Sequence, residues 1–373
     1  MTSNKLIKFN LKDLNTSHSA LLLVSLENIK KNYTFLKKKV NNSDLGISIK
    51  ANAYGLGLKE VCCSLLKLGC KTFFVATPKE ALETIKIAKN ADVYLLNGVN
   101  EKSIALTLIK KGIKIVINNK DQLEKLINIS IEKNLKPACA LHIDTGMNRL
   151  GIDMESIEEI NSLAKNHLNI TLIMSHLSCS ENKLSKINNY QLNRFKRIKN
   201  NFKENKKLKF SLANSYGILL NKKYHFNLCR PGGLIYGLTL NNRSVKGINA
   251  VTRLLAKVLQ VKRITKGDYV GYGAKFKADK KLVIATIGIG YSDGLPRSFS
   301  GSAYYKNFKF PIIGSISMDL CTIDISQYKN LKVNDWVEIF GQSNSIEDFA
   351  SKCDTITYEI TSKIGSRVKR IYL

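Results

Sequence analysis

Several polar side chains stand where short apolar runs of the sequence end. Lys50 closes one such run, His142 and His176 lie at the ends of two later runs, and Asn214 and Ser215 directly follow another. If these runs are parallel strands of one barrel, their carboxyl ends meet on one face, where such barrels gather their catalytic groups. The convergence of a lysine, two histidines, an amide and a hydroxyl predicts an active site on that face.

Lys50 is the residue best suited to covalent chemistry. It follows Gly-Ile-Ser-Ile and precedes Ala-Asn-Ala-Tyr-Gly, so its ammonium emerges from a buried strand. Desolvation lowers the pKa of a lysine in such a place, and a lysine tuned in this way can form a Schiff base. Most of the other lysines are expected to face solvent, and its position at the end of an apolar run distinguishes Lys50 from them.

The segment Arg230-Pro-Gly-Gly offers backbone N–H groups that no side chain obstructs. Such groups suit a phosphate, to which Ser215 and Tyr54 could add hydroxyl donors. The alternative is purely structural, because Gly-Gly is often only a turn and Asn-Ser is often a helix cap.

The composition describes a folded globular protein with a strongly basic surface. Of the 373 residues, 44% are hydrophobic, and the formal net charge is +30. The cations are mostly lysines scattered along the chain, and no nucleic-acid recognition module is recognisable. The sequence therefore favours a solvated lysine surface over a specific nucleic-acid partner and leaves incidental binding of polyanions open.

The eight cysteines contain no CxxC pair and lie mostly within apolar patterns, as free thiols do. They indicate a reducing compartment. The apolar run at residues 20–24 is too short for a signal peptide, and no apolar stretch approaches the roughly 18 residues of a membrane helix. We therefore expect a cytoplasmic protein without membrane association.

Repeated βα units are expected over the first two thirds of the chain. Short apolar runs alternate there with longer amphipathic segments, and the eight runs cover residues 46–50, 71–76, 92–97, 113–117, 138–143, 170–176, 209–213 and 228–236. No GxGxxG follows an early run, which disfavours an open dinucleotide-binding sheet. The pattern predicts an α/β fold that begins with an N-terminal (β/α)8 barrel of TIM type.

The remainder of the chain reads as a second, mostly β domain. After the polar stretch 241–247, strands are expected at 254–261, 281–289, 310–316 and 336–340, separated by Gly, Asp and Lys turns. We therefore predict domains at 1–243 and 244–373. The early run at 20–25 could add a strand to the C-terminal domain.

Four segments together resemble the alanine racemase family, whose members use pyridoxal 5′-phosphate (PLP). They are IKANAYG at 49–55, DTGMNRLG at 144–151, RPGGLIYG at 230–237 and GYSDG at 290–294. Shorter matches at 175–177, 314, 318–319 and 357–359 keep the same order over nearly the whole chain. The resemblance implies a PLP-binding barrel, a C-terminal β domain and a head-to-tail homodimer whose active sites combine residues of both subunits.

The resemblance also implies roles for individual residues. Lys50 corresponds to the lysine that holds PLP as an aldimine and acts as the base on one face of the substrate, and Tyr291 of the partner subunit corresponds to the base on the other face. The residues that match cofactor-binding positions are Lys50, Tyr54, His176, Asn214, Ser215, Arg230, Gly232, Gly233 and Tyr358. Arg149 and Met318 match substrate-binding positions.

The chemistry of racemisation accounts for these residue types. A proton must leave Cα on one side and return on the other, so two groups must flank it. Arg230 matches the partner of the pyridine nitrogen, where a guanidinium can only donate a hydrogen bond. The ring then stays unprotonated and withdraws electrons more weakly than a protonated ring, which favours racemisation over transamination.

Three positions depart from the family pattern. His142 replaces a lysine whose carbamate often holds the arginine matched by Arg149, and histidine cannot supply that anion. Leu56 and Ser315 replace a histidine and an arginine that are common near the substrate entry. These changes suggest that substrates larger than alanine could be admitted.

Alternative functions follow from the same features. One is a broad-specificity amino acid racemase, and another is a PLP decarboxylase, which Arg230 disfavours because that family generally places a carboxylate beside the ring nitrogen. A third is a PLP carrier protein, which resembles the barrel alone. The favoured function is an alanine racemase that supplies D-alanine for peptidoglycan in a bacterial cytoplasm, as the resemblance implies.

Overall fold

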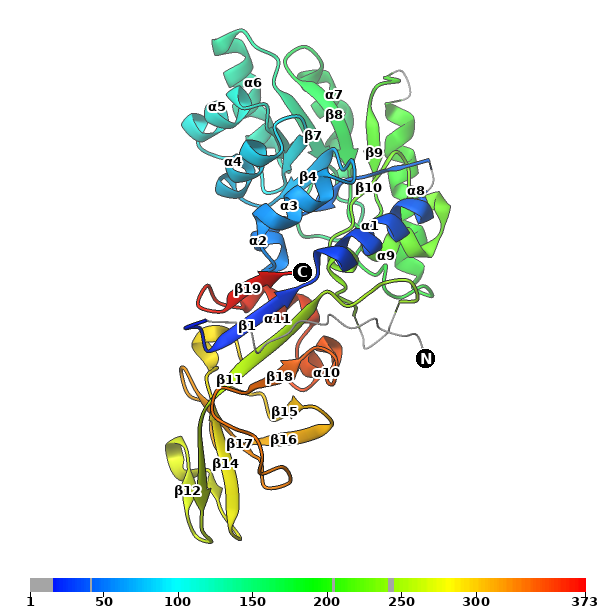
Figure 1. The fold of residues 1–373 in the computed structure, drawn as a ribbon. Coiled ribbons are helices and arrows are strands. Elements are labelled where there is room, and N and C mark those ends of the chain that lie inside the picture. The colour runs from blue at the N-terminus through cyan, green and yellow to red at the C-terminus, as the bar shows by residue number, and fades with distance from the viewer. Residues whose placement is uncertain (1–15, 41, 203–204, 241–244) are drawn as a thin grey trace. The chain divides into compact units, whose positions relative to one another are not determined.

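The computed structural model describes residues 16–40, 42–202, 205–240 and 245–373. The chain divides into two compact units (Figure 1), which we call the barrel unit (Lys30–Ile235) and the β unit (Met1–Ile29 together with Tyr236–Leu373). The domain boundary expected between residues 243 and 244 lies outside the described residues.

Seven strands of the barrel unit form one curled parallel sheet in which each strand lies beside the next in sequence. They are β3 (Ile47–Ser48), β4 (Thr72–Val75), β5 (Asp92–Leu95), β6 (Lys114–Ile117), β7 (Ala138–His142), β8 (Asn169–Met174) and β9 (Lys209–Ser211). The eighth run forms only a short strand, β10 (Leu228–Cys229), which pairs in parallel with β2 (Asp44–Leu45). The predicted α/β class with an N-terminal barrel is confirmed.

Backbone hydrogen bonds place the eighth run beside both edges of the curled sheet. Arg230 N donates to Ala213 O at 2.8 Å, just after β9, and Ser48 N donates to Pro231 O at 3.0 Å, at the end of β3. The strand cannot continue, because Pro231, two residues after its end, has no N–H to donate. The backbone of residues 230–233 therefore lies where the first and last strands meet.

Helices follow the strands and cover the outer face of the sheet (Figure 1). They are α3 (Leu58–Leu66), α4 (Pro78–Ile87), α5 (Lys102–Lys110), α6 (Lys120–Lys133), α7 (Ile157–Lys165), α8 (Lys186–Asn201) and α9 (Ser215–Leu220), and α1 (Leu26–Val40) precedes them. The short element α2 (Lys50–Tyr54), which follows β3, has left-handed rather than right-handed backbone angles. Local caps begin several of these helices. Thr77 and Glu80 form a capping box at α4, and the Asn119 and Asn214 side chains accept hydrogen bonds from the first turns of α6 and α9.

The interior of the barrel changes from apolar to polar toward the carboxyl ends of its strands. One buried cluster consists of Phe74, Tyr94, Val116, Ala140, Leu172, Met174 and Leu228. Strand side chains alternate between faces, so residues two positions further along face the same way. Those residues include Asn118, His142, His176 and Arg230. A polar layer thus follows the apolar one, on the side where the active site is predicted.

The β unit contains a sheet of eight strands in the order β14-β17-β16-β15-β18-β11-β1-β19. Its elements are β1 (Ala20–Val24), β11 (Thr252–Ile264), β12 (Tyr269–Val270), β13 (Phe276–Lys277), β14 (Leu282–Ile287), β15 (Ser302–Tyr305), β16 (Phe308–Ile313), β17 (Cys321–Asp324), β18 (Trp336–Phe340), β19 (Lys369–Tyr372), α10 (Ile346–Ser351) and α11 (Thr357–Lys363). The long strand β11 pairs antiparallel with β1, β14 and β18. The four strands expected in this part of the chain correspond to β11, β14, β16 and β18.

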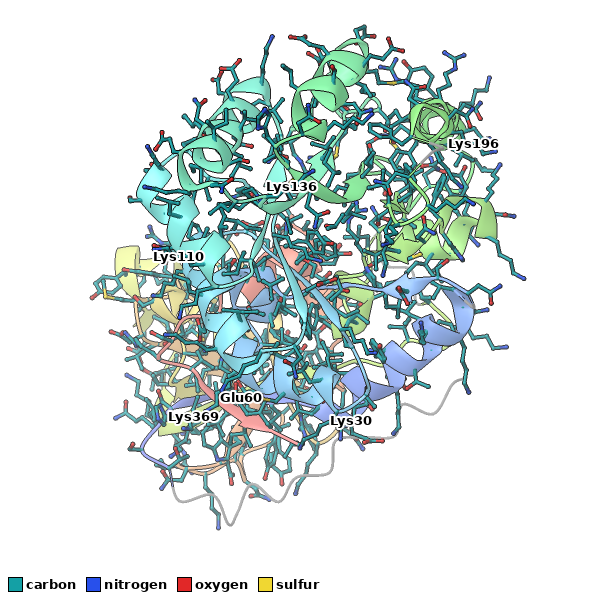
Figure 2. The ribbon with its side chains drawn as sticks, turned by 90° about the horizontal axis from the view of Figure 1, so that it is seen from above. Lys30, Glu60, Lys110, Lys136, Lys196 and Lys369 are labelled. Carbon is teal, nitrogen blue, oxygen red and sulfur yellow. The ribbon has the colours of Figure 1, made fainter. Side chains whose placement is uncertain are left out.

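The surface lysines do not gather on one side of the barrel unit. Lys110 on α5 and Lys196 on α8 are exposed and lie on different sides of it (Figure 2). All eight cysteines are free thiols. Within the described ranges, no helix is both long and apolar enough to cross a membrane.

Candidate active site

Lys50 stands between β3 and a short left-handed turn. The four residues after it, Ala51 to Tyr54, all have positive φ, between 51° and 58°. This conformation costs an L-residue roughly 1–2 kcal/mol, because Cβ approaches the following carbonyl oxygen. The Asn52 side chain supports the turn by accepting a hydrogen bond from Leu58 N at 2.8 Å. Strain of this kind persists only where the surrounding structure enforces it, and it is concentrated at functional sites.

The surroundings of Lys50 favour its neutral amine. Burial lowers the pKa of Lys50 and the charge of Arg149 lowers it further, while the Glu80 carboxylate acts in the opposite direction. A larger neutral fraction at ordinary pH makes the amine a better nucleophile. This agrees with the desolvation of Lys50 that its sequence context predicts.

Arg230 is a buried cation held by carbonyl and hydroxyl oxygens. Arg230 is only 6% exposed. Nη1 donates to Ser211 O at 2.9 Å and to Ser211 Oγ at 2.5 Å, and Nη2 donates to Ser175 O. Burial lowers the pKa of Arg230 to about 10, so it remains charged at neutral pH. No ion pair found among the described residues includes Arg230.

The tautomer of His176 follows from its contact with Arg230. Arg230 Nη2 lies 3.4 Å from His176 Nδ1, Asn214 Nδ2 lies 3.4 Å from Nε2, and a neutral ring accepts at only one nitrogen. The charged Arg230 donor makes the stronger bond, so Nδ1 accepts. The ring proton is then on Nε2. Burial and the charge of Arg230 hold the pKa of His176 well below its usual value, so the ring is neutral. The 3.4 Å approach of Asn214 Nδ2 to Nε2 therefore joins two donors and is a contact only.

A small polar cradle forms where the first, seventh and eighth runs meet. Ser215 Oγ accepts hydrogen bonds from Gly232 N at 2.9 Å and from Leu234 N at 3.4 Å. A Cβ added to Gly232 would lie 2.3 Å from the Tyr54 hydroxyl. Burial raises the pKa of Tyr54, while a hydrogen bond with Ser48 lowers it. Two hydroxyls and two backbone N–H groups thus converge at a position that excludes any residue larger than glycine.

The segment that carries Arg149 is fixed by a carboxylate. Asp144 accepts hydrogen bonds from the backbone N–H groups of Gly146, Met147 and Asn148 at 2.7 to 2.9 Å. Arg149 itself is exposed, and the ion pairs found in the described part of the chain do not include it. The segment is therefore held at its base, and the charge of the exposed Arg149 acts on Lys50 and His176, whose pKa values it lowers.

His142 is a neutral residue of the polar layer. Asn118 donates through Nδ2 to Leu96 O at 3.0 Å, which orients its oxygen toward His142 Nδ1 at 2.8 Å. Nδ1 therefore carries the proton, and Nε2 is left as an acceptor. Burial, with the charge of Arg230, lowers the pKa of His142 to about 4. His142 thus offers no negative charge to Arg149, as expected from the replacement of lysine.

The low pKa of His142 predicts a loss of stability in acid. Above pH 6.5 the ring is neutral in both the folded and unfolded chains, whereas between pH 6.5 and about 4 only the unfolded chain takes up the proton. The free energy of unfolding should fall by about 3 kcal/mol across this window from this residue alone. Urea unfolding at several pH values measures it. His142→Gln should flatten the dependence relative to the wild type and to the control variant of exposed His18, His18→Gln, and an unchanged slope would contradict the prediction.

Tyr291 and Met318 lie side by side in the β unit. Tyr291 N donates to Ser317 O at 3.1 Å, and Ser292 N donates to Met318 O at 3.0 Å. Tyr291 is 44% exposed and Met318 is 52% exposed. Both side chains are therefore accessible to a molecule that docks on this face.

An ion-pair cluster holds the backbone around these two residues. Asp293 accepts a hydrogen bond from Gly290 N at 2.9 Å. Arg367 pairs with Asp293 at 3.2 Å and with Asp319 at 2.7 Å. One arginine thus joins the segment that contains Tyr291 to the segment that contains Met318.

The predicted site residues fall into two groups. Those in the barrel unit lie at the carboxyl ends of its strands or in the segments that follow them, and they are Lys50, Tyr54, Arg149, His176, Asn214, Ser215, Arg230, Gly232 and Gly233. Those in the β unit are Tyr291, Met318 and Tyr358, of which Tyr358 lies in α11, apart in sequence from the other two. The structure brings Tyr291 and Met318 together through backbone hydrogen bonds.

Sequence reasoning missed three polar residues that support the site. Ser211 binds the Arg230 guanidinium, Ser48 binds the Tyr54 hydroxyl, and Asn118 orients His142. Ser48 and Ser211 are polar residues in otherwise apolar strands, and Asn118 directly follows β6. A polar residue within or directly after a buried strand was the signal that could have identified them, because buried polar side chains need hydrogen-bond partners.

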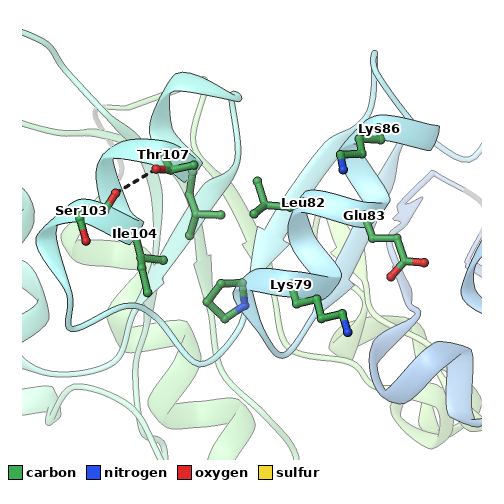
Figure 3. A pocket seen from close by; sticks show the side chains of 9 residues that line it. Lys79, Leu82, Glu83, Lys86, Ser103, Ile104 and Thr107 are labelled. Carbon is green, nitrogen blue, oxygen red and sulfur yellow. Dashed lines mark hydrogen bonds between the residues drawn. The ribbon is translucent and has the colours of Figure 1, made fainter.

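A separate groove of about 720 Å³ lies between α4 and α5, away from these residues. Figure 3 shows Leu82 of α4 turned toward α5, where the Thr107 hydroxyl is bonded to Ser103 O. The groove is lined by Pro78, Lys79, Leu82, Glu83, Lys86, Ser103, Ile104, Thr107 and Leu108. None of the predicted site residues lines it, so it is not the candidate active site.

Comparison with family models gives two matches that together span most of the chain. The model described as the N-terminal domain of alanine racemase matches residues 24–240. The model described as the C-terminal domain of alanine racemase matches residues 251–372.

Curated relatives and solved structures agree with these matches. The alanine racemase of Rickettsia akari is 38% identical over 360 residues, which cover 94% of this chain and 98% of the relative. The catabolic alanine racemase of Mesorhizobium japonicum is 34% identical, over 95% of this chain and 93% of the relative. The crystal structure of Bartonella henselae alanine racemase with covalently bound pyridoxal phosphate has a TM-score of 0.89 at 34% identity, and it covers 95% of this chain and 99% of the other. The biosynthetic alanine racemase of Pseudomonas aeruginosa has a TM-score of 0.86 at 28% identity, with the same coverage.

Proposed function

The chain belongs to the alanine racemase family, and from this premise we propose that it interconverts L-alanine and D-alanine by a two-base mechanism. It is a PLP-dependent racemase. Lys50 exchanges a proton with the substrate Cα on one face, and Tyr291 of the partner subunit exchanges a proton on the other face. Two groups are needed because a single base would largely return the same enantiomer.

The barrel residues fit the cofactor. PLP, when bound, withdraws electrons from the substrate Cα and makes its proton removable. The Tyr54 and Ser215 hydroxyls and the Gly232 and Leu234 N–H groups converge at a cradle that suits a phosphate. Gly233 and Asn214 flank this cradle, Tyr358 is proposed to complete it, and Lys50 supplies the amine that holds the cofactor.

Arg230 and His176 set the electronic character of the cofactor ring. Arg230 is charged, buried and able only to donate, so it would hold the pyridine nitrogen of bound PLP without protonating it. His176 is neutral and accepts from Arg230, which helps to orient the guanidinium. A PLP ring held in this way would withdraw electrons from Cα only moderately, which suits racemisation. A decarboxylase would instead require a carboxylate at this position.

Substrate binding is assigned to Arg149 and to the backbone of Met318. The positive charge of Arg149 lowers the pKa of Lys50, so the two groups interact electrostatically. The exposed Tyr291 and Met318 side chains suit a head-to-tail homodimer in which the β unit of one subunit completes the barrel site of the other. The free cysteines suit a reducing compartment, and we propose a cytoplasmic role in supplying D-alanine for peptidoglycan.

Gly232 provides a test of the phosphate cradle. Gly232→Ala should weaken PLP binding by about 10- to 100-fold, because the added Cβ would lie 2.3 Å from the Tyr54 hydroxyl and displace one of the groups. Absorbance titration of the cofactor-free protein measures the dissociation constant. Adding Tyr54→Phe to this variant should restore thermal stability, since it removes the atom in closest conflict, without restoring PLP affinity. Wild-type affinity in Gly232→Ala would contradict the assignment.

One observation supports the proposed function most strongly. The same barrel contains a lysine whose pKa is lowered and a buried arginine that has no carboxylate partner. The test is incubation of L-alanine with the PLP-loaded protein in deuterated water. We expect both enantiomers to accumulate with deuterium at Cα. Carbon dioxide release would identify a decarboxylase, and unchanged L-alanine would identify a carrier.

A broad-specificity amino acid racemase is the second candidate. It is favoured by the neutral His142, which supplies no anion to Arg149, and by the small Ser315 near Met318. The ratio of kcat/KM for alanine, serine, lysine and arginine separates the two candidates. A strict preference for alanine would discard the broad-specificity alternative.

A further inference from the structure

Glu80 joins two loops that both belong to the catalytic end of the barrel. It lies in the first turn of α4, yet its Oε1 accepts a hydrogen bond from Ala51 N at 2.6 Å. Oε2 accepts from Ala76 N at 2.9 Å and from Thr77 N at 3.1 Å. One carboxylate therefore ties the peptide group after Lys50 to the segment between β4 and α4.

The capping role of Glu80 accounts for only part of this geometry. In a capping box, the glutamate returns a hydrogen bond to the N–H of the cap residue, which here is Thr77. The bond that Oε2 accepts from Thr77 N serves this purpose. The bond that Oε1 accepts from Ala51 N adds nothing to the start of α4, and it comes from a residue 29 positions earlier in the chain.

Ala51 is a position where an external hydrogen bond has structural value. It begins the left-handed turn, and Lys50 is joined to it directly. Alanine and tyrosine have little intrinsic preference for this conformation. Within the turn, Ala53 N bonds to Ile49 O and Gly55 N bonds to Ala51 O, so Ala51 N depends on Glu80 as an acceptor. A charged acceptor makes this bond stronger than a neutral one would.

We propose that Glu80 is a positioning residue for Lys50: its carboxylate fixes the Lys50–Ala51 peptide and thereby the origin and direction of the Lys50 side chain. This inference rests on the proposed function of Lys50 as the residue that holds PLP. It assigns Glu80 no contact with substrate or cofactor. The Coulombic influence of the same carboxylate on Lys50 agrees with their proximity.

The test compares Glu80→Ala with Thr77→Ala. Both variants break the capping box of α4, but only the first removes the acceptor of Ala51 N. Thr77→Ala should lower the melting temperature by about 2–4 °C. Glu80→Ala should lower it further, because the N–H groups of Ala51, Ala76 and Thr77 all lose their acceptor. Glu80→Ala should raise the PLP dissociation constant by about 10- to 100-fold, the order of effect of a displacement of about 1 Å. Thr77→Ala should leave that constant within about threefold.

Glu80→Gln is a third variant, which tests the inference even if Glu80→Ala does not fold. Glutamine keeps one acceptor oxygen, which can serve either Ala51 or the α4 cap but not both, so its PLP affinity should lie between those of the wild type and Glu80→Ala. Borohydride reduction followed by peptide mass spectrometry should show a reduced yield of the Lys50 adduct at limiting PLP in both Glu80 variants.

Equal PLP affinities in Glu80→Ala and Thr77→Ala would overturn the inference and leave Glu80 as a helix cap only. Wild-type affinity and adduct yield in Glu80→Gln, should Glu80→Ala not fold, would also overturn it. These measurements do not require turnover. If PLP attaches to Lys50 but no racemisation occurs, the proposed activity is refuted. The PLP affinities of the variants still test the positioning role of Glu80.

Discussion

Lys50→Ala is expected to abolish racemisation, with a fall in kcat/KM of roughly 10⁴- to 10⁶-fold. The variant lacks both the amine that holds PLP and the group that exchanges a proton on one face of Cα. The absorbance band of the lysine-bound cofactor should disappear, and borohydride should no longer fix PLP to the protein. The rate of racemisation, measured by chiral separation of alanine, gives the size of the loss.

A neighbouring lysine supplies the control for this experiment. Lys59 is exposed and lies in α3, so Lys59→Ala should retain the absorbance band and activity close to those of the wild type. If Lys50→Ala retained the band and racemised alanine at a comparable rate, another lysine would hold the cofactor, and the assignment of Lys50 would be wrong.

Tyr291→Phe is expected to lower racemisation by about 10²- to 10⁴-fold, the usual contribution of a general acid or base. PLP should remain bound, because the cofactor residues of the barrel unit are unchanged. Since the two enantiomers have equal free energies, kcat/KM must fall equally in both directions. The asymmetry should appear in the exchange of the Cα hydrogen with deuterated water, which the variant should lose from the enantiomer that Tyr291 deprotonates and retain from the other.

The exposed Tyr269 on β12 offers a matched control for the loss of a phenol. Tyr269→Phe should leave both racemisation and hydrogen exchange near their wild-type rates. Near-normal racemisation by Tyr291→Phe would remove Tyr291 from its proposed role, as would equal loss of exchange from both enantiomers.

The barrel could be predicted because its strands are short, apolar and separated by amphipathic helices. The exact extent of two of its strands could not be predicted. Residues 233–236 were expected to continue the eighth strand, but they form a turn of 3₁₀ helix after Pro231 and Gly232. The first run was expected over residues 46–50, but β3 covers only Ile47–Ser48, and the turn labelled α2 begins at Lys50. In both places, the apolar pattern continues although the backbone conformation changes.

The functional residues at the strand ends could be predicted from the sequence, whereas the hydrogen bonds that hold them in place could not. Lys50, His142, His176 and Arg230 occupy positions that follow from strand periodicity and from the gathering of carboxyl ends. The left-handed turn after Lys50 has no signal in the sequence, because Ala-Asn-Ala-Tyr is compatible with a right-handed helix. The bond from Glu80 to Ala51 likewise depends on the packing of one βα loop against another. Such contacts depend on tertiary structure rather than on local sequence.

The most direct test of the two-subunit active site is complementation between two inactive variants. Lys50→Ala and Tyr291→Phe are mixed in equal amounts, dissociated and allowed to reassociate with PLP. If each site combines Lys50 of one chain with Tyr291 of the partner subunit, a mixed dimer contains one intact site and one doubly altered site. A random mixture should then regain about a quarter of wild-type racemase activity, since half of its dimers are mixed. Formation of mixed dimers without any recovery of activity would contradict the account.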